Sequence, residues 1–257
     1  MKKIAAILLC FITFSANAQK VIDSVKKDLL TAPDTVKHLR SKKWAFVPPV
    51  VLVAYGASSF AIHPIRDLDF TINDDITKAD PDFSTKAESY FQFAPVIIVY
   101  GLNLAGYGGK NTFIDRTALL GVSGGILALT ATISKQTTHR LRPNGSDYLS
   151  FFSGHTSTAF LGAEFLNQEY SARSPWFGVA GYAIATTTGI FRLYNHDHWF
   201  SDVVAGAGFG ILSTKAAYFI YPYIRNALTR KDKKGKKAYL VPTYLEGSAG
   251  LAFAMQL

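Results

Sequence analysis

Cysteine is almost absent from this chain of 257 residues, which contains only Cys10. That cysteine lies in an apolar stretch, residues 4–14, which follows two lysines and precedes a run of small residues ending at Ala18. The order of basic, apolar and small residues predicts a secretory signal over residues 1–18, with cleavage after Ala18. A mature chain without cysteine excludes disulfide bonds and a thiol nucleophile.

Charged residues are also scarce, at 18% of the chain against 49% hydrophobic residues, and the mean hydropathy is +0.14. This balance predicts a membrane protein. Several apolar stretches are shorter than the roughly 17–25 residues that a spanning helix needs, so helices buried in a soluble domain are the alternative. The expected fold is an all-α bundle with five or six membrane helices, formed by residues of about 44–62, 90–106, 117–134, 156–166, 175–190 and 203–221.

Positive and negative charges are separated along the chain. Residues 20–43 and 225–237 are basic, whereas residues 63–90 are acidic. The positive-inside rule predicts that both basic segments are cytoplasmic, and the second is interpreted as a topology anchor near anionic headgroups, not as a nucleic-acid site. A cleaved signal would leave the mature N-terminus outside, whereas the positive-inside rule places residues 20–43 inside. One of the predicted spans would then not cross the membrane. Residues 44–62, which contain Pro48 and Pro49, are the weakest span, and an interfacial or re-entrant helix there would remove the conflict.

The most informative residues lie in three short segments, Lys135-x6-Arg142-Pro143, Ser153-Gly154-His155 and Arg192-x5-His198-x3-Asp202. His198 and Asp202 are four residues apart, so on a helix the carboxylate would orient the imidazole as a nucleophile. Lys135 and Arg142 are two helical turns apart and would share a face. With Arg192 they supply three cations for phosphate oxygens.

The middle segment would complete a phosphate site. Ser153 and Gly154 precede a predicted helix over residues 156–167, and a small-residue turn before a helix N-terminus offers backbone N–H groups to an anion. His155 is then the candidate general acid for the leaving oxygen. Together, the three segments predict a site that binds and cleaves a phosphate ester.

These segments resemble the signature of the type-2 phosphatidic-acid phosphatase superfamily, which is Lys-x6-Arg-Pro, Pro-Ser-Gly-His and Ser-Arg-x5-His-x3-Asp. The resemblance covers residues 94–222 and implies a helical bundle of the phosphatase and haloperoxidase type. It also implies phosphate binding by the three cations with Ser153 and Gly154, acid catalysis by His155, and attack by His198 assisted by Asp202. Phe152 and Phe191 depart from the pattern, since they stand where the family has proline and serine.

The charge pattern and the strand-like tail, together with the resemblance, predict an organisation and an activity. Residues 19–43 would be a basic N-terminal segment, 44–224 the phosphatase domain, 225–237 a basic segment and 238–257 a tail able to form a short β-hairpin. The expected reaction is hydrolysis of a phosphate monoester or diphosphate of a lipid, such as lipid A or undecaprenyl diphosphate, through a phosphohistidine. We expect an inner-membrane enzyme with a periplasmic site, no metal or cofactor, and inhibition by vanadate.

Four alternatives stay open from the sequence. His155, His196, Asp197, His198 and Asp202 are residue types that bind zinc or manganese, although the three nearby cations would disfavour a divalent ion. A non-specific acid phosphatase, a vanadium haloperoxidase and an inactive lipid-binding membrane protein would use the same fold. A soluble periplasmic location and an outer-membrane association are the alternatives to the inner membrane. His139 and His196 are interpreted as rim or structural histidines.

Overall fold

The computed structural model describes residues 23, 25, 43–228, 238–245 and 248–255. The predicted signal and most of the two basic segments therefore lie outside the described residues. The described part is helical apart from one pair of strands, which confirms the predicted all-α fold with a C-terminal hairpin. The elements are η1 Lys43–Phe46, α2 Val47–Ser58, α3 His63–Ala79, α4 Ala87–Phe91, α5 Ala94–Leu104, α6 Phe113–Thr138, α7 Gly154–Tyr170, α8 Trp176–Tyr194, α9 Phe200–Leu228, β1 Ala238–Leu245 and β2 Ser248–Met255.

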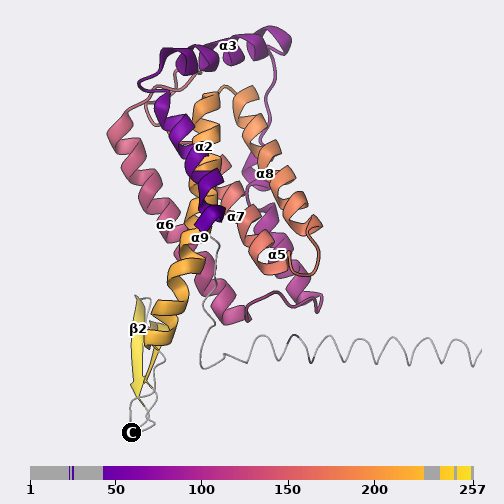
Figure 1. Cartoon of the computed structure of the whole chain (residues 1–257), viewed down its shortest axis with the longest axis vertical. Helices are drawn as coiled ribbons and strands as arrows, with labels where there is room; N and C mark the ends of the chain where they lie inside the picture. The colour runs from indigo at the N-terminus through magenta and orange to yellow at the C-terminus, as the bar shows by residue number, and fades with distance from the viewer. Residues whose placement is uncertain (1–22, 24, 26–42, 229–237, 246–247, 256–257) are drawn as a thin grey trace, which may run out of the picture.

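Helix α7 lies at the centre of the bundle, where it packs against α5, α8 and α9 (Figure 1). Its side chains Phe165, Leu166 and Tyr170 are fully buried, together with Leu119 of α6 and Tyr218 of α9. Helix α9 also packs against α2 and α6. The two helices α7 and α9 therefore hold the remaining helices in place.

Glycines let α9 approach its neighbours closely. A Cβ atom on Gly210 would lie 2.2 Å from the carbonyl oxygen of Ser157 in α7, and one on Gly206 would lie 2.8 Å from that of Ser153. Such small residues permit backbone contact between helices. The run of glycine and alanine in α9 thus brings the start of α7 directly against α9.

Two helices of the described part, α6 and α9, are long and apolar enough to cross a membrane, with mean hydropathies of 1.6 and 1.5. A third span would be the bent pair Trp44–Ser58 and His63–Ala79, whose halves meet at 87°. This is fewer than the five or six predicted spans, although a helix forms at each predicted position. The difference arises because α5 has only 11 residues and α7 only 17, with two buried glutamates. Helix α8 is long enough but contains three consecutive threonines and Arg192.

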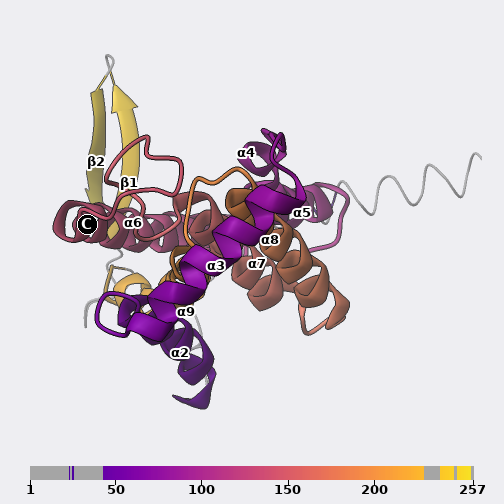
Figure 2. The same cartoon turned by 90° about the horizontal axis from the view of Figure 1, so that it is seen from above.

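The acidic segment contains a helix that the charge pattern did not predict. Helix α3 begins with Pro64 near its N-terminus, a favoured place for proline, and it lies across the end of the bundle (Figure 2). Ile72 and Ile76 share one face with Asp69, and these residues face the segment that precedes α9. Helix α3 therefore covers one end of the bundle.

The predicted hairpin is confirmed at the end of the chain. Strands β1 and β2 are antiparallel, with Leu245 opposite Ser248 and Ala238 opposite Met255. The hairpin lies at the end of α9 that is far from α3 (Figure 1).

We expect Gly210→Ala to destabilise the bundle, because the added methyl group would overlap the backbone of Ser157. Overpacking of this kind costs about 1–3 kcal/mol, which thermal unfolding of the full chain in detergent would measure. Gly125→Ala is the matched control, since a Cβ atom there has nothing within 4 Å. Equal melting temperatures for the two variants would contradict the proposed close contact of α7 and α9.

Candidate active site

The three predicted segments meet at the end of the bundle that α3 covers. Arg142 lies between α6 and α7, His155 is the second residue of α7, and His198 lies between α8 and α9. Each segment thus follows or precedes a helix that packs on α7 or α9. The packing of these helices brings together residues as far apart in the chain as Arg142 and His198, which are 56 positions apart.

His198 is buried, with 3% of its surface exposed, and lies between an arginine and a carboxylate. Its Nε2 atom is 3.2 Å from Nη1 of Arg142. A guanidinium only donates hydrogen bonds, so Nε2 is the acceptor and the ring proton is assigned to Nδ1. Nδ1 is 3.9 Å from Oδ2 of Asp202, which is too long for a hydrogen bond. The ring is therefore placed with its lone pair toward Arg142 and its proton toward Asp202.

Burial lowers the pKa of His198 to about 4. Asp202 opposes this effect, while the charges of Arg142 and Arg192 add to it. His198 is consequently neutral at neutral pH. A neutral imidazole has the free lone pair that nucleophilic attack requires.

Asp202 is fully buried and accepts several hydrogen bonds besides its contact with His198. Its Oδ1 accepts from Nη1 of Arg140 at 2.8 Å. Its Oδ2 accepts from the hydroxyl of Ser150 at 2.5 Å and from the backbone N–H of Trp199 at 3.0 Å. A buried carboxylate needs such donors and a countercharge to stay ionised. Arg140 supplies that countercharge.

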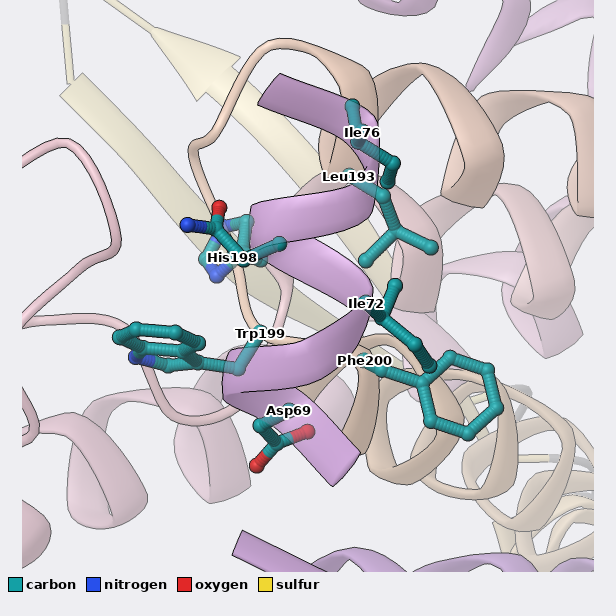
Figure 3. Close-up of a pocket in the computed structure, with 8 residues that line it drawn as sticks. Asp69, Ile72, Ile76, Leu193, His198, Trp199 and Phe200 are labelled. Atoms are coloured by element: carbon teal, nitrogen blue, oxygen red, sulfur yellow. The ribbon is translucent and has the colours of Figure 1, made fainter. Parts of the chain in front are cut away.

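Arg140 also binds Asp69 of α3, with Nη2 2.6 Å from Oδ2. The same carboxylate accepts from the backbone N–H and the hydroxyl of Ser201, each at 2.7 Å. Figure 3 shows Asp69 on α3 beside the segment that carries His198 and Trp199. Neither Arg140 nor Asp69 was predicted, yet they connect α3 to the carboxylate behind the candidate nucleophile.

The three predicted cations each contact a nearby acceptor. Arg142 donates from Nε to Asp147 at 2.8 Å and from Nη1 to the carbonyl of Asp197 at 3.0 Å. Lys135 donates from Nζ to the carbonyl of Leu149 at 2.5 Å. Lys135 is close enough to Arg142, Arg192 and Asp202 to interact electrostatically with all three. The cations are therefore gathered in one electropositive site around His198.

Arg192 is paired with two carboxylates, Asp197, which the sequence analysis considered only as a metal ligand, and Glu88, which it did not select. Its Nη1 lies 2.8 Å from Oδ2 of Asp197 and 3.2 Å from Oε1 of Glu88 in α4. Its buried Nε atom makes no hydrogen bond within the part of the chain that the structure describes. Arg192 thus has a donor left for a further anion.

Ser153 caps α7 through its side chain. Its hydroxyl lies 3.4 Å from the backbone N of Thr156 and 2.8 Å from the hydroxyl of Thr156. The backbone N–H of Ser153 donates to the carbonyl of Asp202 at 3.1 Å. The predicted phosphate contact of this segment would thus come from the N–H groups at the start of α7, beginning at Gly154, because the first N–H groups of a helix lack intrahelical partners.

His155 is half-buried, and its Nε2 lies 3.5 Å from the hydroxyl of Ser89 in α4. Burial lowers the pKa of His155, and Arg192 and Arg142 act in the same direction. The carboxylates of Glu88 and Asp197 raise it. His155 is thus the second histidine of the site, with a different set of charged neighbours from His198.

Two further histidines, His139 and His196, were interpreted as rim or structural residues. His139 ends α6 in a left-handed conformation, and Nδ1 of His196 lies 2.7 Å from Oδ1 of Asn73 in α3. Within the described residues, no three His, Cys, Asp or Glu side chains form a group that could hold a metal ion. The five residues of the metal alternative therefore do not assemble around one point.

Both departures from the family pattern serve aromatic packing. Phe152 is fully buried and stacks on Phe209 of α9 with ring centroids 4.2 Å apart. Phe191 packs against Phe83 and Phe91 at 6.2 and 6.0 Å. Each replacement supports an element that lines the site.

We expect Asp69→Asn to weaken the packing of α3, because the ion pair with Arg140 is lost. Hydrogen bonds between buried charged groups contribute roughly 2 kcal/mol, so thermal unfolding in detergent should begin at a lower temperature. Asp67→Asn on the exposed side of the same helix is the control. If the two variants unfold alike, the Asp69–Arg140 pair does not stabilise the fold.

Comparison with known proteins agrees with the geometry. Residues 116–226 match the family model described as the PAP2 superfamily. A lipid A 1-phosphatase of Porphyromonas gingivalis is 34% identical over 187 residues, which are 72% of this chain and 40% of that protein. The chain thus spans less than half the length of this curated relative.

A solved structure shares the fold. It is the transmembrane PAP2 type phosphatidylglycerolphosphate phosphatase of Bacillus subtilis, which superposes with a TM-score of 0.50 and 20% identity over 69% of this chain and 97% of the other. All three motif segments lie within the matched residues 116–226, on a scaffold that contains apolar helices of membrane-spanning length. The protein is a membrane protein, and its helical domain belongs to the PAP2 superfamily.

Proposed function

We propose that this protein is a membrane phosphatase that hydrolyses a lipid phosphate monoester or diphosphate through a phosphohistidine. The observation that carries the proposal is the environment of His198, whose neutral ring directs Nε2 toward Arg142 with Asp202 on the other side. The relative named lipid A 1-phosphatase supports lipid A as the substrate, with undecaprenyl diphosphate as the second candidate.

In the first step, Nε2 of His198 attacks phosphorus while the bond to the ester oxygen breaks. The leaving oxygen takes the bonding electron pair and a proton from His155. Lys135, Arg142 and Arg192 bind the non-bridging oxygens, and the charge that develops there is stabilised by fixed cations. Asp202 stabilises the ring of His198 as it becomes positively charged.

In the second step, water attacks the phosphohistidine and the P–N bond breaks. His155, which has lost its proton, accepts one from that water, and His198 returns to its neutral form. Each group thus ends the cycle as it began. These residues supply a nucleophile, an acid and three cations, so the proposed reaction does not require a metal.

An apolar cavity beside the site supports a lipid substrate. Its volume is about 350 Å³ and it lies between α5, α6 and α7. Gly154 lines it at the catalytic end, and Val96, Leu127 and Leu161 are among its apolar walls. A headgroup at the cations would leave space for an apolar chain along this cavity.

We further propose that the site faces the periplasm from the inner membrane. Helix α9 begins beside His198 and continues toward the basic residues 225–237. Its 27 residues from Phe200 to Asn226, with a mean hydropathy of 1.5, extend about 40 Å, enough to cross the hydrocarbon core. If the basic segment is cytoplasmic, as the positive-inside rule predicts, the catalytic end of α9 is on the opposite side.

We expect His198→Ala to reduce phosphate release by more than about 1,000-fold, because the nucleophile is removed. His155→Ala should cost about 100- to 10,000-fold with an alkyl phosphate, whose leaving oxygen needs a proton, and less with an aryl phosphate. Release of phosphate from lipid A, undecaprenyl diphosphate and simple esters would be measured at neutral pH, with and without EDTA. His63→Ala, on the exposed start of α3, is the control.

Two outcomes would contradict the mechanism. Wild-type rates in both histidine variants would remove the proposed acid and nucleophile. Loss of wild-type activity in EDTA would show that a metal takes part. Acid quenching of a single turnover should trap labelled phosphate on wild-type protein and not on His198→Ala.

The orientation predicts that a reporter fused after Lys237 stays in the cytoplasm. A fusion partner that becomes active only in the periplasm should then be inactive, while a cytoplasmic reporter at the same place should be active. The opposite pair of results would place the basic segment outside and overturn the periplasmic orientation without affecting the proposed reaction.

A further inference from the structure

We propose that Glu88 and Ser89 of α4 form a positioning pair for His155, as Asp202 does for His198. This inference rests on the proposed function, because it assigns His155 the role of general acid. Both residues precede the three motif segments and lie outside the matched residues 116–226. They would extend the catalytic site to a part of the chain that the motifs do not include.

The geometry places Ser89 between the carboxylate and the imidazole. The Ser89 hydroxyl lies 3.5 Å from Oε1 of Glu88 and 3.5 Å from Nε2 of His155. These distances are long for hydrogen bonds, but contacts in an enzyme without substrate commonly shorten when substrate binds. In the shortened arrangement, Nε2–H of His155 donates to Ser89 and the Ser89 hydroxyl donates to Glu88. Nδ1 is then the nitrogen that passes its proton to the leaving oxygen.

Glu88 is buried, with 4% of its surface exposed, although it lies at the edge of the bundle. Oε1 contacts Nη1 of Arg192 at 3.2 Å, and Oε2 makes no hydrogen bond within the described residues. A buried carboxylate whose charge is only partly compensated destabilises the folded protein. Stabilising a protonated histidine during catalysis gives that charge a function.

The charges around His155 show why such a carboxylate is needed. Arg192 and Arg142 face His155 as cations, and Glu88 and Asp197 face it as carboxylates. The phosphate site requires the arginines, but they disfavour the imidazolium form that an acid must have. Without the carboxylates, His155 would lose its proton before it could protonate a leaving oxygen.

Helix α4 is held firmly enough to position this pair. The backbone N–H of Thr85 donates to Oδ1 of Asn195 at 3.1 Å, and Nδ2 of Asn195 donates to the carbonyl of Thr85 at 2.9 Å. Asn195 directly follows α8, which carries Arg192. The same contact therefore fixes α4 relative to both Arg192 and the segment that leads to His198.

The test compares two esters that differ in their need for a general acid. 4-Nitrophenyl phosphate has a good leaving group, whereas a long-chain alkyl phosphate has a poor one. With the full chain in detergent, Glu88→Gln should lower kcat on the alkyl ester by about 10- to 100-fold and on the aryl ester by less than about threefold. Ser89→Ala should give a smaller loss of the same kind.

The pH profile is the second measurement. The acid must be protonated, so activity falls as the pH rises through the pKa of His155. Removing the charge of Glu88 lowers that pKa, and the alkaline limb for Glu88→Gln should therefore move to lower pH by about one unit. Thr85→Ala is the matched control, since its hydroxyl contacts the backbone of α4 and no catalytic group.

The outcomes separate this inference from the proposed function. Equal losses on both esters in Glu88→Gln and Ser89→Ala, or an unshifted alkaline limb, would make the pair structural and overturn the inference. Phosphate release by the wild type and its loss in His198→Ala would still support the phosphatase. If Glu88→Gln does not fold, the leaving-group dependence of Ser89→Ala decides the question.

Discussion

The site depends on one buried guanidinium. Arg140 lies between Asp69 of α3 and Asp202 of α9, at 2.6 and 2.8 Å, and its guanidinium carbon lies 5.3 and 5.8 Å from the ring centroids of Phe60 and Trp199. Two buried carboxylates without a countercharge would be unfavourable, and Arg140 makes both of them possible. The position of the candidate nucleophile therefore depends on the docking of α3 as well as on the motif that contains it.

The sequence was sufficient to predict that the motif residues meet, because three motifs with fixed spacings restrict where these side chains can go. The helical positions predicted for them were partly wrong, since α6 ends at Thr138, before Arg142, and His198 lies before α9. The sequence did not predict Asp69 or Arg140. In sequence, each resembles a solvated charge, Asp69 within an acidic segment and Arg140 beside Arg142. The apolar spacing of Ile72 and Ile76 was available as a sign of a helix with one buried face, but the excess of aspartate concealed it. Whether a charged side chain is buried depends on partners that are distant in the sequence, and a local pattern does not include those partners.

The same reason explains the number of membrane spans. Composition correctly indicated a membrane protein. The number of spans was overestimated because each apolar stretch was counted as one membrane helix. Helix α7 carries Glu164 and Glu169, which are neutralised by Lys215 at 2.6 Å and Arg116 at 3.2 Å. Such pairs let a polar helix occupy the middle of a membrane protein, where ionisable groups are otherwise expensive. Apolar length alone therefore identifies α6 and α9 as spans and misses α7 at the centre of the bundle.

A phosphatase that uses two histidines faces an electrostatic conflict. The cations that bind phosphate lower the pKa of both histidines, which suits a neutral nucleophile such as His198 and opposes a protonated acid such as His155. Because both rings experience Arg142 and Arg192, the phosphate site by itself cannot give them different protonation states. The difference comes first from burial, which is nearly complete for His198 and only partial for His155. It comes also from the carboxylates, since Arg140 compensates the charge of Asp202, whereas Glu88 keeps one oxygen without a hydrogen bond within the described residues. The carboxylates around the site, as much as the cations in it, then determine which histidine attacks phosphorus and which one donates a proton.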